Sequence, residues 1–391
     1  MAFKEAQATL SVSNRAKPKP TILEAKINYG HQPGPGPNAP VLLLLHGHSS
    51  SIHEFKNVLE LLEDEAEVFS FDQPNCGESG DLARGPVLSG WSARAPYGAL
   101  YFLRDLTDAF VQQVIRKVIK APRKIRIAGG SLGGNLTLLL AERNPRYPWL
   151  ERATLWSPGS AWDTSLGQSE AAGVAYQRAE RDWSKPGELR AFLSLTFCHK
   201  TIPLPAPPSY PQPWYWYYDC WGETQGPGQC TGKGEGSCPQ CKGKKPKLQY
   251  GGAELGAPDN YPGMGATKVM AIESALNGLA KNLTPLRAAW HWEIAAEQVE
   301  LSHLQLLEPD NLPRLASLQC DTRFLAGMED RHAPAALYQD TKHLFQVARD
   351  HFAGRAGAPT IDSQWIAGAG HSIHNEKPKE VADLLLRKEL T

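Results

Sequence analysis

The sequence lacks three features that would assign it to large classes of proteins. No run approaches the 18 apolar residues of a membrane-spanning helix, and residues 1–20 hold no apolar core of signal-peptide length. Net charge is also absent, because 41 Lys and Arg residues balance 41 Asp and Glu residues, so no nucleic-acid or anionic-membrane partner is expected. We therefore expect a soluble cytoplasmic protein in which residues 1–20 form a polar tail.

The 391 residues are enough for one large α/β domain and a second unit. Apolar patterning predicts strands over residues 21–29, 41–45, 67–72 and 153–156, and helices over residues 52–62, 97–119 and 378–390. The run 41–45 is continuously apolar, as in a strand buried on both faces of a parallel sheet. Alternation of strands and helices favours a doubly wound sheet.

The most informative segment is the glycine-rich turn at residues 129–133, GGSLG. A β-branched run at 125–128 precedes it and a helix-like run at 136–143 follows, which predicts a strand, a sharp turn and a helix. Side chains at the flanking glycines would collide with the neighbouring strand and helix. The turn would lift the Ser131 hydroxyl to a helix N-terminus, where the N–H of Leu132 can stabilise an oxyanion. The alternative is a glycine-rich turn that holds a serine by chance.

A serine hydroxyl is a weak nucleophile at neutral pH and needs a base and an orienting acid. Two later strand patterns, at residues 322–327 and 360–367, run into turns that carry Asp330 and His371. Both residues therefore follow the C-terminal ends of strands, where open α/β sheets place their functional sites. The chain order is Ser131, Asp330, His371.

Five segments in this order resemble the α/β-hydrolase family. They are a His-Gly turn (LLLLHG, 42–47), an Asp-x-x-x-x-Gly-x-Ser turn (FDQPNCGES, 71–79), the serine turn (GGSLGG), the acid turn (GMEDRHAP) and the histidine loop (GAGHSIHNEKPKEVADLL). The resemblance covers residues 21–158 and 313–391. It implies an α/β fold class, with a doubly wound, mostly parallel α/β-hydrolase sheet and a large inserted cap domain.

The resemblance also implies a role for each site residue. Ser131 would be the nucleophile, His371 the general base and then the general acid, and Asp330 the group that orients His371. The backbone N–H groups of His48 and Leu132 would form the oxyanion hole.

Each catalytic role has an alternative residue. Asp163 follows the preceding strand, where some family members keep the acid, and is the alternative to Asp330. Glu329 is adjacent in sequence and is expected to point elsewhere. His374 is interpreted as a solvated histidine or one that supports the catalytic groups, and His46 as structural.

The strand and helix alternation stops over residues 159–312, where this family commonly inserts a cap. The core domain would then comprise residues 21–158 and 313–391. Residues 214–221, WYWYYDCW, contain six aromatic side chains, which favours a small local core and would also fit a wall for an apolar substrate.

Four of the seven cysteines lie within residues 214–250 of the insert: Cys220, Cys230, Cys238 and Cys241. The sequence CPQCKG is typical of a zinc knuckle, in which two thiolates reach one metal. We expect a structural zinc ion on these four cysteines, because the segment has too little apolar surface for a core. Cys198, His199 and Cys320 are alternative ligands. A disulfide, disfavoured in the cytosol, or free thiols are the alternatives to a metal. No organic cofactor is expected.

A serine nucleophile implies acyl transfer and argues against epoxide and haloalkane hydrolysis, for which family members use aspartate. The turn FDQPNCGES also resembles proline-iminopeptidase-like hydrolases, but those usually show His-Gly-Gly-Pro-Gly where this chain has HGHSS at residues 46–50. We therefore expect an esterase or thioesterase acting on a bulky, partly apolar small molecule. The alternatives are an aminopeptidase or amidase, an acyltransferase, and a non-catalytic binding protein that uses the zinc insert.

Overall fold

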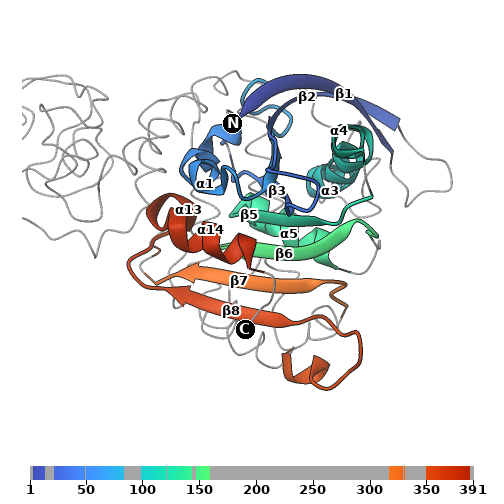
Figure 1. Ribbon diagram of the computed structural model, residues 1–391. Coiled ribbons are helices and arrows are strands. Elements are labelled where there is room, and N and C mark those ends of the chain that lie inside the picture. Colours follow the sequence, from blue (N-terminus) through green and yellow to red (C-terminus); the bar gives the residue numbers. More distant parts are fainter. Residues whose placement is uncertain are drawn as a thin grey trace, which may run out of the picture.

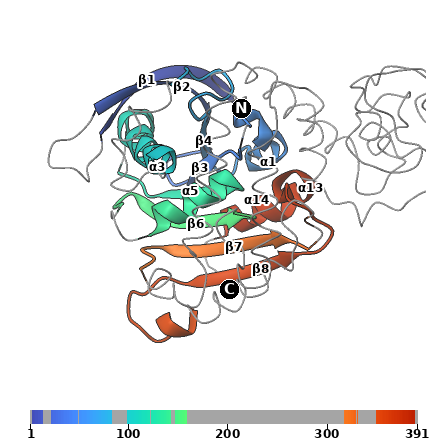
Figure 2. The same ribbon diagram turned by 180° about the vertical axis from the view of Figure 1, so that it is seen from behind.

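The computed structural model describes residues 3–13, 22–48, 50–82, 98–120, 122–142, 147–158, 317–328, 330 and 349–387. Their centre is an eight-stranded sheet with the order β1-β2-β4-β3-β5-β6-β7-β8 (Figure 1). The strands are β1 (Lys4–Ser13), β2 (Ile22–Gln32), β3 (Val41–Leu45), β4 (Glu67–Phe71), β5 (Ile125–Gly130), β6 (Leu150–Trp156), β7 (Asp321–Gly327) and β8 (Ile361–Ile366). Seen from either side, β1 and β2 lie at one end of the sheet and β7 and β8 at the other (Figure 2).

The sheet is mixed but mostly parallel. β2 pairs antiparallel with both β1 and β4, whereas the six strands from β4 through β8 in the sheet order pair in parallel. Parallel neighbours require crossover connections, which helices supply. The predicted doubly wound, mostly parallel sheet is therefore confirmed, while the predicted cap at 159–312 lies outside the described residues.

The prediction of a polar tail at residues 1–20 is wrong for the segment that forms β1. This strand pairs with β2 along its full length, from Lys4 opposite His31 to Ser13 opposite Ile22. Most of its side chains are exposed, and only those of Leu10 and Val12 are fully buried. An edge strand with so few apolar positions gives a weak hydrophobic pattern, which explains why the sequence did not reveal it.

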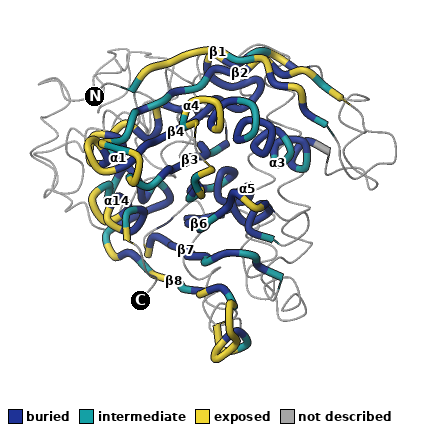
Figure 3. Tube along the Cα trace, turned by 45° about the vertical axis from the view of Figure 1, so that its right-hand side comes forward, coloured by how far each residue is buried: buried dark blue, intermediate teal, exposed yellow. Residues whose placement is uncertain are grey.

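Helices cover both faces of the sheet. They include η1 (Ile52–Phe55), α1 (Lys56–Leu62), α3 (Gly98–Phe110), the π-helical turn η2 (Val111–Ile115), α4 (Arg116–Ile119), α5 (Leu132–Ala141), α13 (Ile373–Glu376) and α14 (Pro378–Leu386). In Figure 3, α1 and α14 lie on one side of the sheet, and α3 and α5 on the other. No helix within the described ranges is both long and apolar enough to span a membrane.

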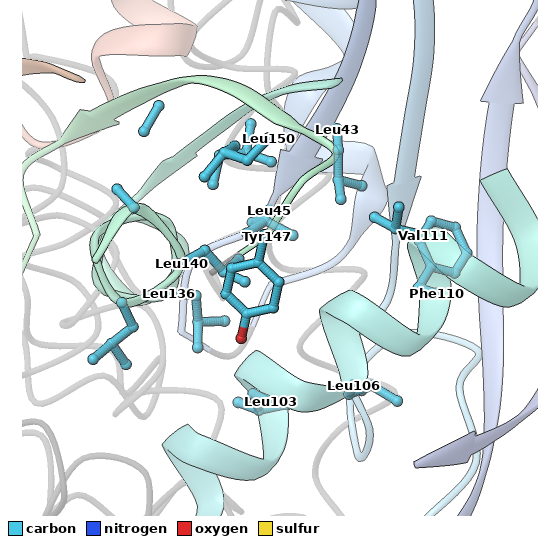
Figure 4. Packing of buried hydrophobic residues seen from close by; sticks show 14 of the residues in the cluster. Leu43, Leu45, Leu103, Leu106, Phe110, Val111, Leu136, Leu140, Tyr147 and Leu150 are labelled. Carbon is cyan, nitrogen blue, oxygen red and sulfur yellow. The ribbon is translucent and has the colours of Figure 1, made fainter. Parts of the chain in front are cut away.

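Strand β3 connects the two hydrophobic cores, because successive side chains of a strand point to opposite faces. Leu43 and Leu45 pack with residues of α3 and α5, as Figure 4 shows for Leu43, Leu45, Leu103, Leu106, Leu136 and Leu140. Leu42 and Leu44 instead pack with residues of α1 and α14. All five side chains of this strand are buried, so the continuous apolar run predicted its position correctly.

Two arginines at the amino-terminal ends of the parallel strands hold the end of α14. The Nη1 atom of Arg126 on β5 donates to the carbonyls of Leu385 at 3.1 Å and Leu386 at 3.0 Å. Arg152, its neighbour on β6, donates to the carbonyl of Arg387. The last carbonyls of a helix have no intrahelical donor, so these side chains supply the missing donors. Their positive charges also interact favourably with the negative end of the helix dipole.

Candidate active site

The C-terminal ends of five parallel strands form one edge of the sheet. β3, β5, β6, β7 and β8 are consecutive neighbours, and they end within two residues of one another in the register, with Leu45 beside Gly129, Trp156 beside Leu325 and Gly327 beside Ile366. The segments that follow these strands contain His46, Ser131, Ser157, Asp330 and His371. Residues that are up to 325 positions apart in the sequence therefore meet at one edge.

Ser131 lies in the sharp turn between β5 and α5. Its backbone has φ 54° and ψ −117°, a left-handed conformation that costs a non-glycine residue about 1–3 kcal/mol. The N–H of Ser131 donates to the carbonyl of Trp156 at 3.0 Å, and the N–H of Asn135 donates to the carbonyl of Ser131 at 3.0 Å. These bonds hold the turn, and the side chain is half-buried at the start of the helix.

The glycines around Ser131 are required by close backbone approaches. A Cβ atom on Gly129 would lie 2.6 Å from the backbone carbonyl of Gly133, and one on Gly133 would overlap the carbonyl of Leu45. A Cβ atom on Gly130 would overlap the indole ring of Trp156. The predicted steric reason for this glycine pattern is therefore confirmed, with β6 contributing a third contact.

Asp330 and His371 form a buried hydrogen-bonded pair. The Nδ1 atom of His371 lies 2.8 Å from Oδ2 of Asp330, and the two residues are 6% and 3% exposed. Because Asp330 engages Nδ1, the Nε2 atom is the one that would take a proton from a serine. The alternatives Asp163 and Glu329 lie outside the described residues.

The loop after β3 lies directly against the turn that carries Ser131. A Cβ atom on Gly47 would be 3.6 Å from Cβ of Ser131. His48 is buried in the turn that follows, and Leu132 is the first residue of α5. Both predicted oxyanion-hole residues therefore follow the C-terminal ends of the neighbouring strands β3 and β5; the role of their N–H groups remains a prediction.

His46 is engaged on both ring nitrogens by the backbone. Its Nε2 accepts the N–H of Gln73 at 2.8 Å, and its Nδ1 lies 2.8 Å from the carbonyl of Gly47. Burial lowers the pKa of this ring, although the nearby Asp72 carboxylate acts in the opposite direction. These contacts agree with the structural role expected for His46.

Asp72 explains the turn motif at residues 71–79. Its Oδ1 accepts the N–H of Ile52 at 2.7 Å, and its Oδ2 accepts the N–H of Glu78 at 2.9 Å. Gly77 has φ 49°, and a Cβ atom there would overlap the carboxylate of Asp72. The motif thus anchors the start of η1 to the end of β4.

Sequence reasoning missed a buried polar group beside the site, Glu54. This residue is 9% exposed on η1, and its carboxyl accepts the N–H of Gly47. Of the two interpretations of His374, that of a solvated histidine is wrong, because the residue is 5% exposed and packs against Trp156. Residues 52–62 contain three charged residues, Glu54, Lys56 and Glu60, and nothing in the sequence marks Glu54 as the buried one.

The four expected zinc ligands, Cys220, Cys230, Cys238 and Cys241, lie outside the described residues. Of the alternatives, Cys320 is described and lies directly before β7. This residue is buried, and burial raises the pKa of its thiol to about 12.

Residues 42–384 match the profile of the Alpha/beta hydrolase family, and the chain therefore belongs to this family. No curated protein sequence matches the chain significantly.

Solved structures share the fold at low sequence identity. A candidate lipase from Acinetobacter baumannii is 15% identical with a TM-score of 0.54, over 97% of this chain and 89% of that chain. A candidate hydrolytic enzyme from Pseudomonas aeruginosa is 17% identical with a TM-score of 0.52, over 99% and 95%. A candidate aryl esterase from Burkholderia cenocepacia is 14% identical with a TM-score of 0.50, over 97% of both chains. These similarities establish the fold.

Proposed function

We propose that this protein is a serine hydrolase that cleaves an ester or thioester through an acyl-enzyme. The observation that carries the proposal is the buried pair of Asp330 and His371, 2.8 Å apart, on the same sheet edge as a serine held in a left-handed turn at a helix start. A protein without catalysis has no physical need for this combination.

In the proposed reaction, Oγ of Ser131 attacks the carbonyl carbon of the substrate while Nε2 of His371 takes the hydroxyl proton. The carboxylate of Asp330 holds the ring and stabilises the imidazolium that forms. The N–H groups of His48 and Leu132 would bind the oxyanion. His371 then returns the proton to the leaving alcohol or thiol, and water cleaves the acyl-enzyme by the same steps.

The substrate class rests on the sequence of the insert. The aromatic side chains at residues 214–221 favour a bulky, partly apolar acyl compound. The esterase and lipase names attached to two structurally similar proteins agree with ester chemistry. We place ester and thioester cleavage ahead of amide cleavage because residues 46–50 depart from the peptidase-like pattern.

The test is intact-mass analysis after treatment with a fluorophosphonate, which reacts with activated serines. The proposal expects one adduct on the wild type, mapped to Ser131 by peptide analysis, and none on Ser131→Ala. Ser363→Ala is the matched control, since Ser363 is a half-buried serine on β8, and it should label like the wild type.

A panel of aryl esters and acyl thioesters of increasing chain length would then define the substrate. Absence of an adduct on folded wild-type protein, together with no turnover of the panel, would contradict the proposal and favour a binding role for the insert.

A further inference from the structure

Glu54 is a buried carboxyl that the proposed reaction does not use. It lies on η1 and is 9% exposed. Its Oε1 and Oε2 atoms accept the backbone N–H of Gly47 at 3.1 and 3.2 Å, and the side chain of Ser50 also donates to the carboxyl. One side chain therefore holds both ends of the segment that contains the proposed oxyanion-hole residue His48.

On its other side, the Glu54 carboxyl faces His374 of α13. The Nε2 atom of His374 lies 3.9 Å from Oε1 of Glu54, and Nδ1 accepts the indole N–H of Trp156 at 3.1 Å. Because an indole N–H can only donate, Nδ1 of His374 is the acceptor in this contact. The amide nitrogen Nδ2 of Asn375 lies 2.9 Å from Nε2 of His374.

Trp156 links this pair to the nucleophile. Its backbone carbonyl accepts the N–H of Ser131 at 3.0 Å, and its indole ring fills the space that a side chain on Gly130 would need. Polar contacts thus run from Gly47 through Glu54, His374 and Trp156 to Ser131, with the 3.9 Å approach of Glu54 to His374 as the one step that is not a hydrogen bond. They join the two loops whose spacing defines the site.

We propose that Glu54 is a positioning residue. As an uncharged acid, it holds the loop at residues 47–50 against the turn that carries Ser131, and this fixes the distance between the proposed oxyanion-hole amides and Ser131. This inference rests on the proposed function. A neutral carboxyl accepts the Gly47 N–H without placing a negative charge beside the developing oxyanion.

The charge state of this cluster follows from its burial. Burial raises the pKa of Glu54 to about 8, and burial, aided by nearby His371, lowers the pKa of His374 to about 3. Both groups are therefore neutral at pH 7. The other titratable groups on the elements packed around Glu54 are His46 and His48 after β3, His53 on η1, Lys56 and Glu60 on α1, Asp72 after β4, and His371, Glu376 and Lys377 around α13. Lys56 is exposed and Lys377 is half-buried, and within the described residues the ion-pair contact of Glu54 is with His374.

The proposal predicts an alkaline fall in activity as Glu54 ionises at about pH 8. Glu54→Gln keeps an acceptor oxygen and stays neutral, so it should retain kcat near the wild-type value at pH 7 and lose this fall. Glu54→Ala leaves the Gly47 N–H without its acceptor and should lower kcat about 10- to 100-fold, with a smaller change in KM. Glu60→Gln, an exposed glutamate on α1, is the matched control and should behave as the wild type.

The experiment measures kcat and KM from pH 6 to 10 for the wild type and these three variants, with infrared spectra at pH 7. A carbonyl band of a protonated carboxylic acid, present in the wild type and absent in Glu54→Gln, would support the neutral state independently of activity. A wild-type alkaline fall that persists in Glu54→Gln, or a Glu54→Ala variant with reduced thermal stability but unchanged kcat, would overturn this proposal alone. A wild type that does not label at Ser131 would overturn the proposed function, and this proposal with it.

Discussion

The Nδ1 atom of His371 lies 2.8 Å from Oδ2 of Asp330, and both side chains are buried at the carboxyl edge of the sheet. This contact makes the role of Asp330 testable against the sequence alternative Asp163. Asp330→Asn should lower kcat about 10³- to 10⁴-fold, because an amide favours the wrong tautomer of the ring. Turnover of an active ester, with circular dichroism to verify folding, measures the effect. A larger loss in Asp163→Asn than in Asp330→Asn would show that the acid is Asp163.

The buried His374 should make the protein less stable in acid. Its pKa is lowered from 6.5 to about 3 in the folded state, so below pH 6.5 the unfolded chain binds a proton that the folded chain does not. Stability from this group is therefore present above pH 6.5 and is lost as the pH falls toward 3. His374→Gln should lose less stability than the wild type between pH 7 and pH 5, as measured by urea unfolding.

Glu54 titrates in the opposite sense, so the comparison must be between variants at each pH. Its pKa is raised from 4.5 to about 8, and its contribution to stability is lost as the pH rises through this window. Subtracting the free energy of unfolding of His374→Gln from that of the wild type at the same pH removes the contribution of Glu54, which both proteins share. His53→Gln, at a half-exposed ring, is the control, and an equal effect of both substitutions would contradict a special role for His374.

The glycine at the end of the serine turn should tolerate no side chain. In Gly133→Ala, the new Cβ would overlap the carbonyl of Leu45, and β3 cannot move because both of its faces are packed. We expect a loss of several kcal/mol or failure to fold, as is typical of severe core clashes. Gly36→Ala, where a Cβ meets no atom within 4 Å, should change the free energy of unfolding by less than about 0.5 kcal/mol. Chemical denaturation of both variants checks this.

These tests also show where the sequence was informative. The turn around Ser131 could be predicted because its chemistry is local, with glycines, strand and helix all within about twenty residues. Glu54 could not, because its acceptor role depends on Gly47 across a turn and on His374 from the far end of the chain. β1 was missed because a half-exposed edge strand buries only Leu10 and Val12 fully, which leaves little periodic signal.

The proposed zinc site rests on sequence alone and calls for a direct measurement. We expect about one zinc ion per chain in the purified protein, bound by Cys220, Cys230, Cys238 and Cys241, as in four-cysteine structural sites. A strong chelator should lower the melting temperature, and Cys238→Ser should reduce the metal content. Four thiolates close the coordination sphere, so fluorophosphonate labelling of the remaining folded protein should persist. Elemental analysis without stoichiometric metal would refute the site.

Removing the arginine contact to α14 should affect stability but not chemistry. Arg126→Met keeps most of the apolar stem and deletes the bonds to Leu385 and Leu386, for which we expect a loss of about 1–3 kcal/mol. The unfolding midpoint and kcat should be measured together. A fall in kcat at temperatures where the variant is fully folded would contradict this separation.

The arginines and the proposed catalytic residues occupy opposite ends of the same strands. One end of β5 carries Arg126 and the other leads into Ser131, only five positions later in the chain. The two ends can therefore be engineered as independent variables. Substitutions at the arginine end would tune how long the enzyme survives heating, and substitutions at the serine end would tune its turnover, so a thermostable variant need not be a slower one.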